Sequence, residues 1–172
     1  MRLFVAICLN DDIKQKLCAL IESLRDAGMR GRFSRPELLH LTLAFLGETP
    51  DARAVIRAVE GVKAERFTLT IAGLGRFRRG GGDILWAGVE LSAELAALHG
   101  SLIARLKSEG FALDPGEYRP HVTLAREVKN GHAGSAATLA PCRMPVTRIS
   151  LMKSERLEGR LVYTEVYSKS LV

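Results

Sequence analysis

The feature that most constrains the fold of this chain is a six-residue pattern that occurs twice. Residues 40–45 read His-Leu-Thr-Leu-Ala-Phe and residues 121–126 read His-Val-Thr-Leu-Ala-Arg, with four of six positions identical. The copies lie 81 residues apart, nearly half of the 172-residue chain. Because a solenoid needs at least three shorter repeats, the pattern instead predicts two related halves of one domain over 1–172. The two copies of the motif are residues 40–43 and residues 121–124.

Signals for strands and helices are mixed along the whole chain. Strands are expected at 3–9, 39–46, 67–71, 84–89, 118–128, 143–153 and 160–169. Helix starts are indicated by Asn10 or Asp11, by Thr49 with Pro50 as the first helical residue, and by Ser92. Residues 130–140 fit either a loop or a short helix. Hairpin-like neighbours and β-α-β steps together favour an α+β fold with mostly antiparallel sheets.

The composition indicates what kind of partner the protein binds and in which cellular compartment it occurs. Lys and Arg number 25 against 19 Asp and Glu, which gives a net charge of +6 and favours phosphate-bearing partners. Three widely spaced cysteines suit neither a disulfide framework nor a zinc site, so we expect reduced thiols. The apolar run at 3–9 is too short for a signal peptide or a membrane span. We therefore expect a soluble, cytoplasmic protein that makes no membrane contact.

The repeated motif predicts where its polar side chains point. Alternate residues of a strand share a face, so His40 lies beside Thr42, and His121 lies beside Thr123. If the halves pack about a pseudo-two-fold axis, the two pairs meet across a shared groove.

Two imidazoles in one groove suit acid and base catalysis near neutral pH, because unperturbed imidazole titrates near about 6.5. Threonine hydroxyls and arginines can hold phosphate oxygens. The sequence shows no H-E-x-x-H motif and no carboxylate cluster beside the histidines. These residues favour metal-free cleavage of a phosphodiester, and a strained cyclic phosphate suits them well.

The paired motifs HLTL and HVTL resemble those of the 2H phosphoesterase superfamily. The strings MRLFVAICL, HLTLAFLGE, ILWAGVEL and RPHVTLAR are similar to its RNA 2′,3′-cyclic phosphodiesterase branch, also called 2′-5′ RNA ligase, over essentially the whole chain. The resemblance implies a bilobal fold of two pseudo-symmetric α+β halves that flank a central cleft. It also implies hydrolysis of RNA 2′,3′-cyclic phosphate ends to 2′-phosphate ends, without a metal or other cofactor, by a monomer.

The resemblance further implies individual roles. These are His40 as proton donor, His121 as proton acceptor, Thr42, Thr123 and Arg126 as phosphate contacts, and Phe45 as a contact of the terminal nucleoside. Strict alternation places Phe45 and Arg126 on the face opposite the histidines. We therefore expect each strand to end, twist or bulge near Ala44 and Ala125.

Three other functions remain open at this point. The same site could join a cyclic phosphate end to a 5′-hydroxyl as a 2′-5′ link, or it could hydrolyse small cyclic phosphates. A non-catalytic module that binds RNA ends belongs to a different class, and two titrating imidazoles argue against it.

Several further residues carry expectations. The basic, glycine-rich segment 76–82 is either an arm that follows an RNA backbone or a solvated hairpin tip. Candidates for a basic rim are Arg30, Arg32, Arg35 and Arg119. We expect His99 beside the apolar stripe of a helix, at its boundary with solvent. We expect His132 in a solvated loop and Trp86 in the core.

Overall fold

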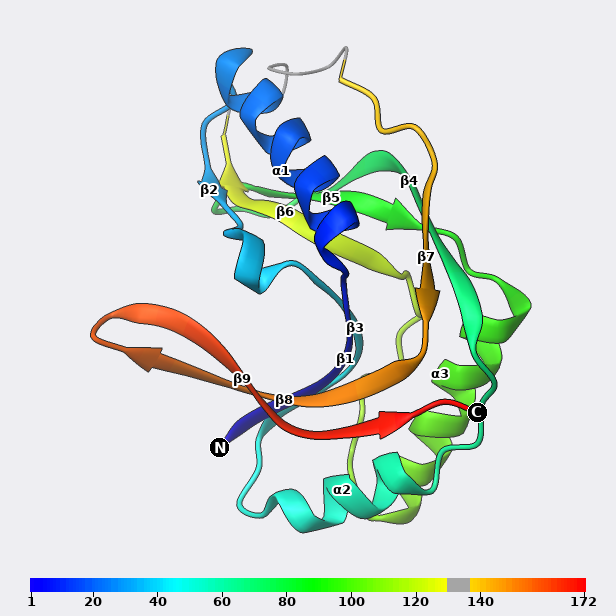
Figure 1. Cartoon of the computed structure of the whole chain (residues 1–172). Helices are drawn as coiled ribbons and strands as arrows, with labels where there is room; N and C mark the ends of the chain where they lie inside the picture. The colour runs from blue at the N-terminus through cyan, green and yellow to red at the C-terminus, as the bar shows by residue number, and fades with distance from the viewer. Residues whose placement is uncertain (130–136) are drawn as a thin grey trace.

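A computed structural model describes residues 1–129 and 137–172. It combines helices with two antiparallel sheets (Figure 1). In chain order the elements are β1 (Arg2–Cys8), α1 (Asp11–Asp26), β2 (Arg32–Phe33), the 3₁₀ helix η1 (Pro36–Leu38), β3 (His40–Glu48), α2 (Ala52–Glu60), β4 (Phe67–Phe77), β5 (Asp83–Val89), α3 (Ala93–Ser108), β6 (His121–Val128), β7 (Cys142–Val146), β8 (Arg148–Leu157) and β9 (Arg160–Ser170).

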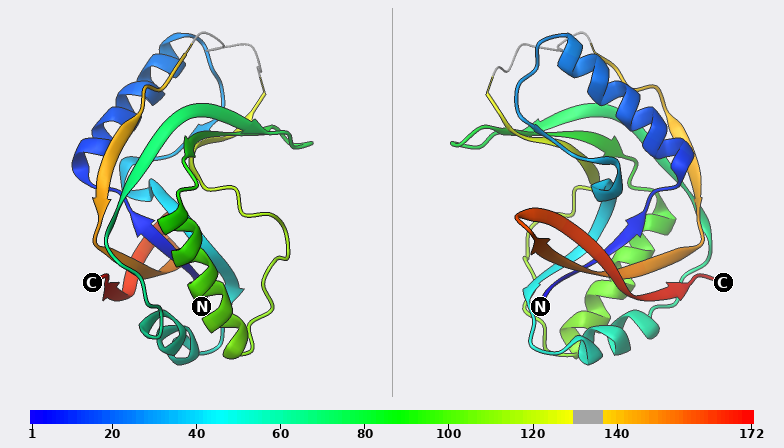
Figure 2. Two further views of the ribbon diagram at one scale, coloured as in Figure 1. Left: turned by 90° about the vertical axis from the view of Figure 1, so that its right-hand side faces the viewer. Right: turned by 60° about the vertical axis from the view of Figure 1, so that its left-hand side comes forward.

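The two sheets repeat one plan. The first has strand order β3-β1-β8-β9 and the second has β2-β6-β5-β4-β7. Each motif strand pairs with the strand that precedes a helix, so β1-α1-β3 corresponds to β5-α3-β6. The motif strands β3 and β6 contact each other where the two sheets approach (Figures 1 and 2). The predicted α+β fold of two related antiparallel halves is confirmed.

The helices form because capped, amphipathic segments can cover the apolar faces of the sheets. The Asn10 side chain accepts a hydrogen bond from the Ile13 amide at 3.0 Å, and Ser92 does the same for Leu95 at 3.1 Å. Both caps are as predicted for α1 and α3. The buried stripes of the helices join the inward side chains of both sheets in a single apolar cluster.

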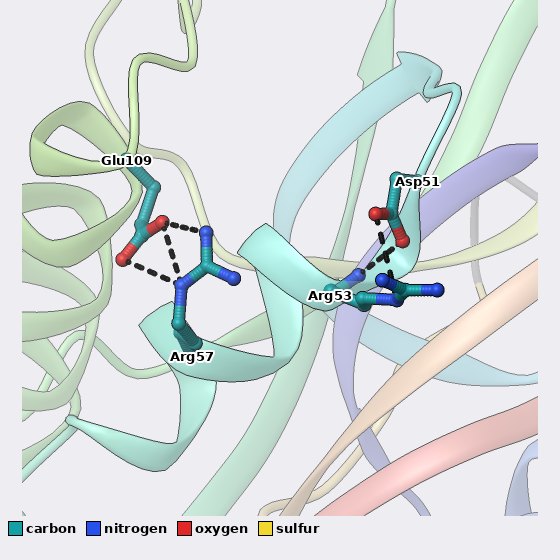
Figure 3. Close-up of polar contacts among 4 residues, drawn as sticks. All are labelled: Asp51, Arg53, Arg57 and Glu109. Atoms are coloured by element: carbon teal, nitrogen blue, oxygen red, sulfur yellow. Dashed lines mark hydrogen bonds and ion pairs between the residues drawn. The ribbon is translucent and has the colours of Figure 1, made fainter.

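Helix α2 begins two residues later than predicted. Asp51 is its N-cap, and its carboxylate accepts from the Arg53 amide at 2.9 Å (Figure 3). Thr49 is buried instead, and its amide donates to the Met1 carbonyl at 2.7 Å. The Thr49 hydroxyl donates to the Gly47 carbonyl at 3.3 Å, so this side chain is directed back along β3 and does not cap the helix. Figure 3 also shows Arg57 of α2 bound to Glu109 at the end of α3, at 2.7 Å.

Two other boundaries differ from the predictions. The strand expected at 143–153 is two strands, because the chain leaves the second sheet after Val146 and enters the first at Arg148. Apolar side chains recur on both sides of the crossing, which is marked only by two consecutive exposed residues, Thr147 and Arg148. The strand expected at 67–71 extends to Phe77, which leaves 78–82 as the hairpin tip. The expectation for His132, and most of segment 130–140, lies outside the described residues.

Cys8 and Cys18 are half-buried free thiols, and Cys142 is a buried one. Among the helices that the structure describes, none is both long and apolar enough to cross a membrane.

Candidate active site

A β-bulge in β3 turns Phe45 toward the face that carries His40 and Thr42. In the pairing with β1, Ala6 lies opposite Thr42 and Val5 lies opposite Ala44, so Leu43 is the extra residue. Leu43 and Ala44 are consecutively buried, whereas Phe45 is 54% exposed. The predicted departure from alternation is confirmed at this position.

The second motif strand has the same irregularity at the equivalent place. In the pairing of β5 with β6, Trp86 lies opposite Thr123 and Leu85 lies opposite Ala125, so Leu124 is the extra residue. Arg126 is exposed and follows two consecutive buried residues. The bulge therefore brings Arg126 to the face of His121 and Thr123, as predicted.

Both histidines are held by a backbone carbonyl two residues earlier in the chain. His40 Nδ1 lies 2.7 Å from the Leu38 oxygen, and His121 Nδ1 lies 2.7 Å from the Arg119 oxygen. A carbonyl can only accept a hydrogen bond, so Nδ1 carries a proton in each ring. Proton exchange with a substrate is therefore left to Nε2 in both histidines.

The Thr42 hydroxyl lies against the exchanging nitrogen of His40. Its Oγ1 is 2.9 Å from His40 Nε2. When the imidazole is neutral the hydroxyl donates to Nε2, and when the ring is charged Nε2 donates to the hydroxyl oxygen. Thr42 can therefore support both protonation states of His40.

Charges from the second half act on the histidine of the first. Burial lowers the pKa of His40, and the hydrogen bond to the Leu38 carbonyl opposes this shift. The positive charges of Arg126 and of protonated His121 lower the pKa of His40 further. Because these groups come from β6, the structure brings the predicted residues of both motifs to one site.

Aromatic rings pack beside each imidazole. Phe4 of β1 and Tyr163 of β9 have ring centroids 4.9 Å and 5.3 Å from that of His40. Phe77 of β4 and Trp86 of β5 lie 4.9 Å and 6.0 Å from His121. These apolar walls restrict the orientation of the rings and the access of water to them.

The predicted basic rim consists largely of paired side chains. Arg32 binds Glu127 at 3.0 Å, and Arg119 lies 3.5 Å from Glu117. Arg35 donates to the Leu161 carbonyl and also contacts Glu37. Arg30 is exposed and lies two residues before β2.

Comparison with known proteins places these motifs in a family. The family model of the 2′-5′ RNA ligase superfamily matches residues 13–158. The chain belongs to this superfamily, the 2H phosphoesterases. The predictions of this family and of a hydrolase within it are confirmed.

Two relatives and one solved structure illustrate the similarity. A Thermotoga maritima protein named RNA 2′,3′-cyclic phosphodiesterase is 33% identical over 133 residues, which are 73% of this chain and 70% of that protein. A Thermus thermophilus protein of the same name is 30% identical over 182 residues, covering 99% and 90%. The crystal structure of Escherichia coli LigT complexed with 3′-AMP has a TM-score of 0.84 and 27% identity, covering 99% and 97%.

In this 2H phosphoesterase, sequence reasoning missed the aromatic neighbours of the histidines. Trp86, which the sequence predicts in the core, is half-buried and lies beside the His121 ring at a tilt of 50°. Gly75 explains its position, because a Cβ there would lie 2.1 Å from the indole ring. The repeat contains a signal for two of these aromatic residues. Phe4 lies six residues before the helix cap Asn10, and Trp86 lies six residues before the helix cap Ser92.

His99 lies beside the buried stripe of α3 as predicted, half-buried, with its ring stacked on that of Tyr118 at a centroid distance of 3.7 Å. Across residues 1–129 and 137–172, no three His, Cys, Asp or Glu side chains lie close enough together to hold a metal ion.

Proposed function

We propose that this protein hydrolyses the 2′,3′-cyclic phosphate at the end of an RNA strand and leaves a 2′-phosphate. The observation that carries the proposal is the pair of equivalent imidazoles, each with Nδ1 bound to a carbonyl and Nε2 left for proton exchange. The influence of the second-half charges on His40 supports their action on one substrate. The names of the relatives support the choice of RNA cyclic phosphate.

In the proposed reaction, His121 Nε2 accepts a proton from a water molecule whose oxygen attacks the phosphorus. The bond from phosphorus to the ribose 3′-oxygen breaks, and His40 donates its Nε2 proton to that oxygen. The products are a 2′-phosphate and a 3′-hydroxyl, so atoms and charges balance. Burial suits His40 to the role of donor, because a lowered pKa makes the imidazolium a stronger acid.

The remaining predicted residues bind the substrate in this proposal. Thr42, Thr123 and Arg126 contact the phosphate oxygens, on which negative charge increases in the transition state. Phe45 lies against the terminal nucleoside. The Phe45 ring is 54% exposed, and the Arg2 guanidinium lies over one of its faces at 5.1 Å from the centroid, which supports this role for the ring. We propose that the reaction needs no metal ion.

A product analysis tests this function. A short oligoribonucleotide with a 2′,3′-cyclic phosphate end is incubated with the protein in excess EDTA, and the new end is identified. We expect a 2′-phosphate, with rates reduced at least about a hundredfold by His40→Ala and by His121→Ala. Arg53→Ala serves as the control, because that side chain is 85% exposed on α2. A 3′-phosphate product, or a requirement for metal, would contradict the proposed reaction.

A further inference from the structure

The tip of the β4–β5 hairpin, residues 78–82, forms a basic depression together with Lys129. Arg78 and Arg79 line it from the hairpin, and Lys129 lines it from the end of β6. All three side chains belong to exposed residues. The hairpin projects from the body of the molecule in both views of Figure 2. The hairpin therefore offers a surface to the part of a long substrate that extends beyond the histidine site.

A glycine fixes this depression against the second motif strand. Gly82 has φ +117°, and a Cβ added there would lie 2.6 Å from the backbone of Glu127. Only glycine allows so close an approach in that conformation. The hairpin tip is therefore held beside the end of β6, with its cations next to Lys129.

One aromatic ring connects the tip to the histidine site. The Phe77 ring lies 4.9 Å from the His121 ring, and the Arg79 guanidinium lies 5.6 Å from the centroid of the same phenyl ring. An RNA strand whose terminal phosphate lies at His121 can therefore pass over or beside the β4–β5 hairpin.

Positive charge is in excess at this tip. Asp83 is the carboxylate that lies among its cations, 3.7 Å from Arg76 and 3.5 Å from Arg78. The other nearby carboxylate, Glu127, is bound to Arg32 at 3.0 Å. Within the described part of the chain, the side chains of Arg79 and Lys129 have no carboxylate partner, although the Arg79 amide donates to Asp83 at 3.3 Å.

The hairpin in the other half provides an internal comparison. In β8–β9, Lys153 binds Glu155 at 3.0 Å and Arg160 contacts Glu37 at 3.3 Å. Arg156 donates to the Gly159 carbonyl. Arg79 likewise donates to a backbone carbonyl, that of Arg78, so the two hairpins differ chiefly in Lys129, which has no carboxylate partner among the described residues.

We propose that the basic tip formed by Arg78, Arg79 and Lys129 binds the phosphodiester backbone of the single-stranded RNA that leads to the cyclic phosphate. The inference rests on the proposed function and adds a preference for oligoribonucleotides over mononucleotides. Arginine and lysine contacts to phosphates are independent of base sequence and are weakened by salt.

The double variant Arg78→Ala/Arg79→Ala tests this preference. Its kcat/KM is measured on a cyclic-phosphate oligoribonucleotide and on a nucleoside 2′,3′-cyclic phosphate, at 50 and 200 mM salt. Two lost contacts to a single strand reduce the salt slope by about 1.4, so the salt-induced decrease on the oligoribonucleotide becomes about sevenfold smaller. We expect no change on the mononucleotide. Lys16→Ala/Arg53→Ala is the charge-matched control. Equal effects on both substrates would overturn the proposal.

A binding measurement separates this proposal from the proposed function. The probe is a fluorescent oligoribonucleotide with a 3′-phosphate end, followed by anisotropy. We expect the double variant to bind about tenfold more weakly than the control variant. If the double variant binds more weakly but the wild type hydrolyses no cyclic phosphate, the proposed function is wrong and the proposed RNA-binding surface is supported. Equal binding by both variants overturns the RNA surface, whatever the activity.

Discussion

At the scale of the residue, equivalent positions of the two motifs carry different side chains after the bulge. Phe45 follows the first motif and Arg126 follows the second. The first half therefore adds an exposed aromatic ring to the site, and the second half adds a cation whose charge acts on His40. In the proposed function, this difference adapts a symmetric framework to an asymmetric substrate, which has a nucleoside on one side of its phosphate.

Replacing Arg126 with glutamine should raise the pKa of His40. The positive charge of Arg126 disfavours the imidazolium, so its removal stabilises the protonated ring. The pKa is read from the pH titration of the imidazole signals by NMR in the free protein. Arg32→Gln is the control, because Arg32 lies opposite Arg126 in the β2–β6 pairing but is bound to Glu127. An unchanged His40 pKa in Arg126→Gln would contradict the described electrostatics.

The positions of His40, Thr42, His121 and Thr123 could be predicted from sequence because alternation is a local property of a strand. The rings of Tyr163 and Phe77 could not. They reach the histidines through sheet neighbours that are distant in the chain, β1 beside β8 and β5 beside β6, and that register is set by tertiary packing.

At the scale of the element, the two bulges show how much a local pattern can indicate. Each strand places two small or apolar residues in succession, Leu43-Ala44 and Leu124-Ala125, where alternation requires one to face the site. The need to bury both predicts the extra residue. The start of α2 was predicted wrongly because Thr49 and Asp51 both have cap-forming side chains, and only the direction of the Thr49 hydroxyl, which donates to the Gly47 carbonyl, decides between them.

Tyr118 connects the segment before the second motif to the first motif strand. Its hydroxyl donates to the Thr42 carbonyl at 3.0 Å, and its ring stacks on His99 of α3. Tyr118→Phe should cost about 1 kcal/mol of unfolding free energy, because the buried bond is lost. It should also lower kcat more than it changes KM, because the alignment of His40 with His121 loosens.

Chemical denaturation and steady-state kinetics measure both effects of Tyr118→Phe. Tyr167→Phe is the matched control, since Tyr167 is partly buried against the core and its hydroxyl has no hydrogen-bond partner among the described residues. If both variants lose the same stability and keep the same kcat, Tyr118 does not position the motifs.

At the scale of the whole molecule, the repeat predicted two related halves but not their strand order. The chain crosses from the second sheet to the first between β7 and β8, so the halves exchange strands instead of folding in succession. The burial phase changes at the exposed pair Thr147 and Arg148, but this local break does not indicate which sheet the next strand joins. The single apolar cluster beneath both sheets supports the prediction that 1–172 is one domain. A monomeric state and a cytoplasmic location stay predictions.

In the proposed reaction, His40 and His121 act as a complementary acid and base on one phosphate. The pH dependence of kcat/KM on a cyclic-phosphate oligoribonucleotide tests it most directly, in the wild type and in each histidine-to-alanine variant. We predict a bell-shaped profile for the wild type. His40→Ala should lose the alkaline limb, because the donor no longer has to be protonated, and His121→Ala should lose the acidic limb. Variants that both keep the full bell would contradict the account.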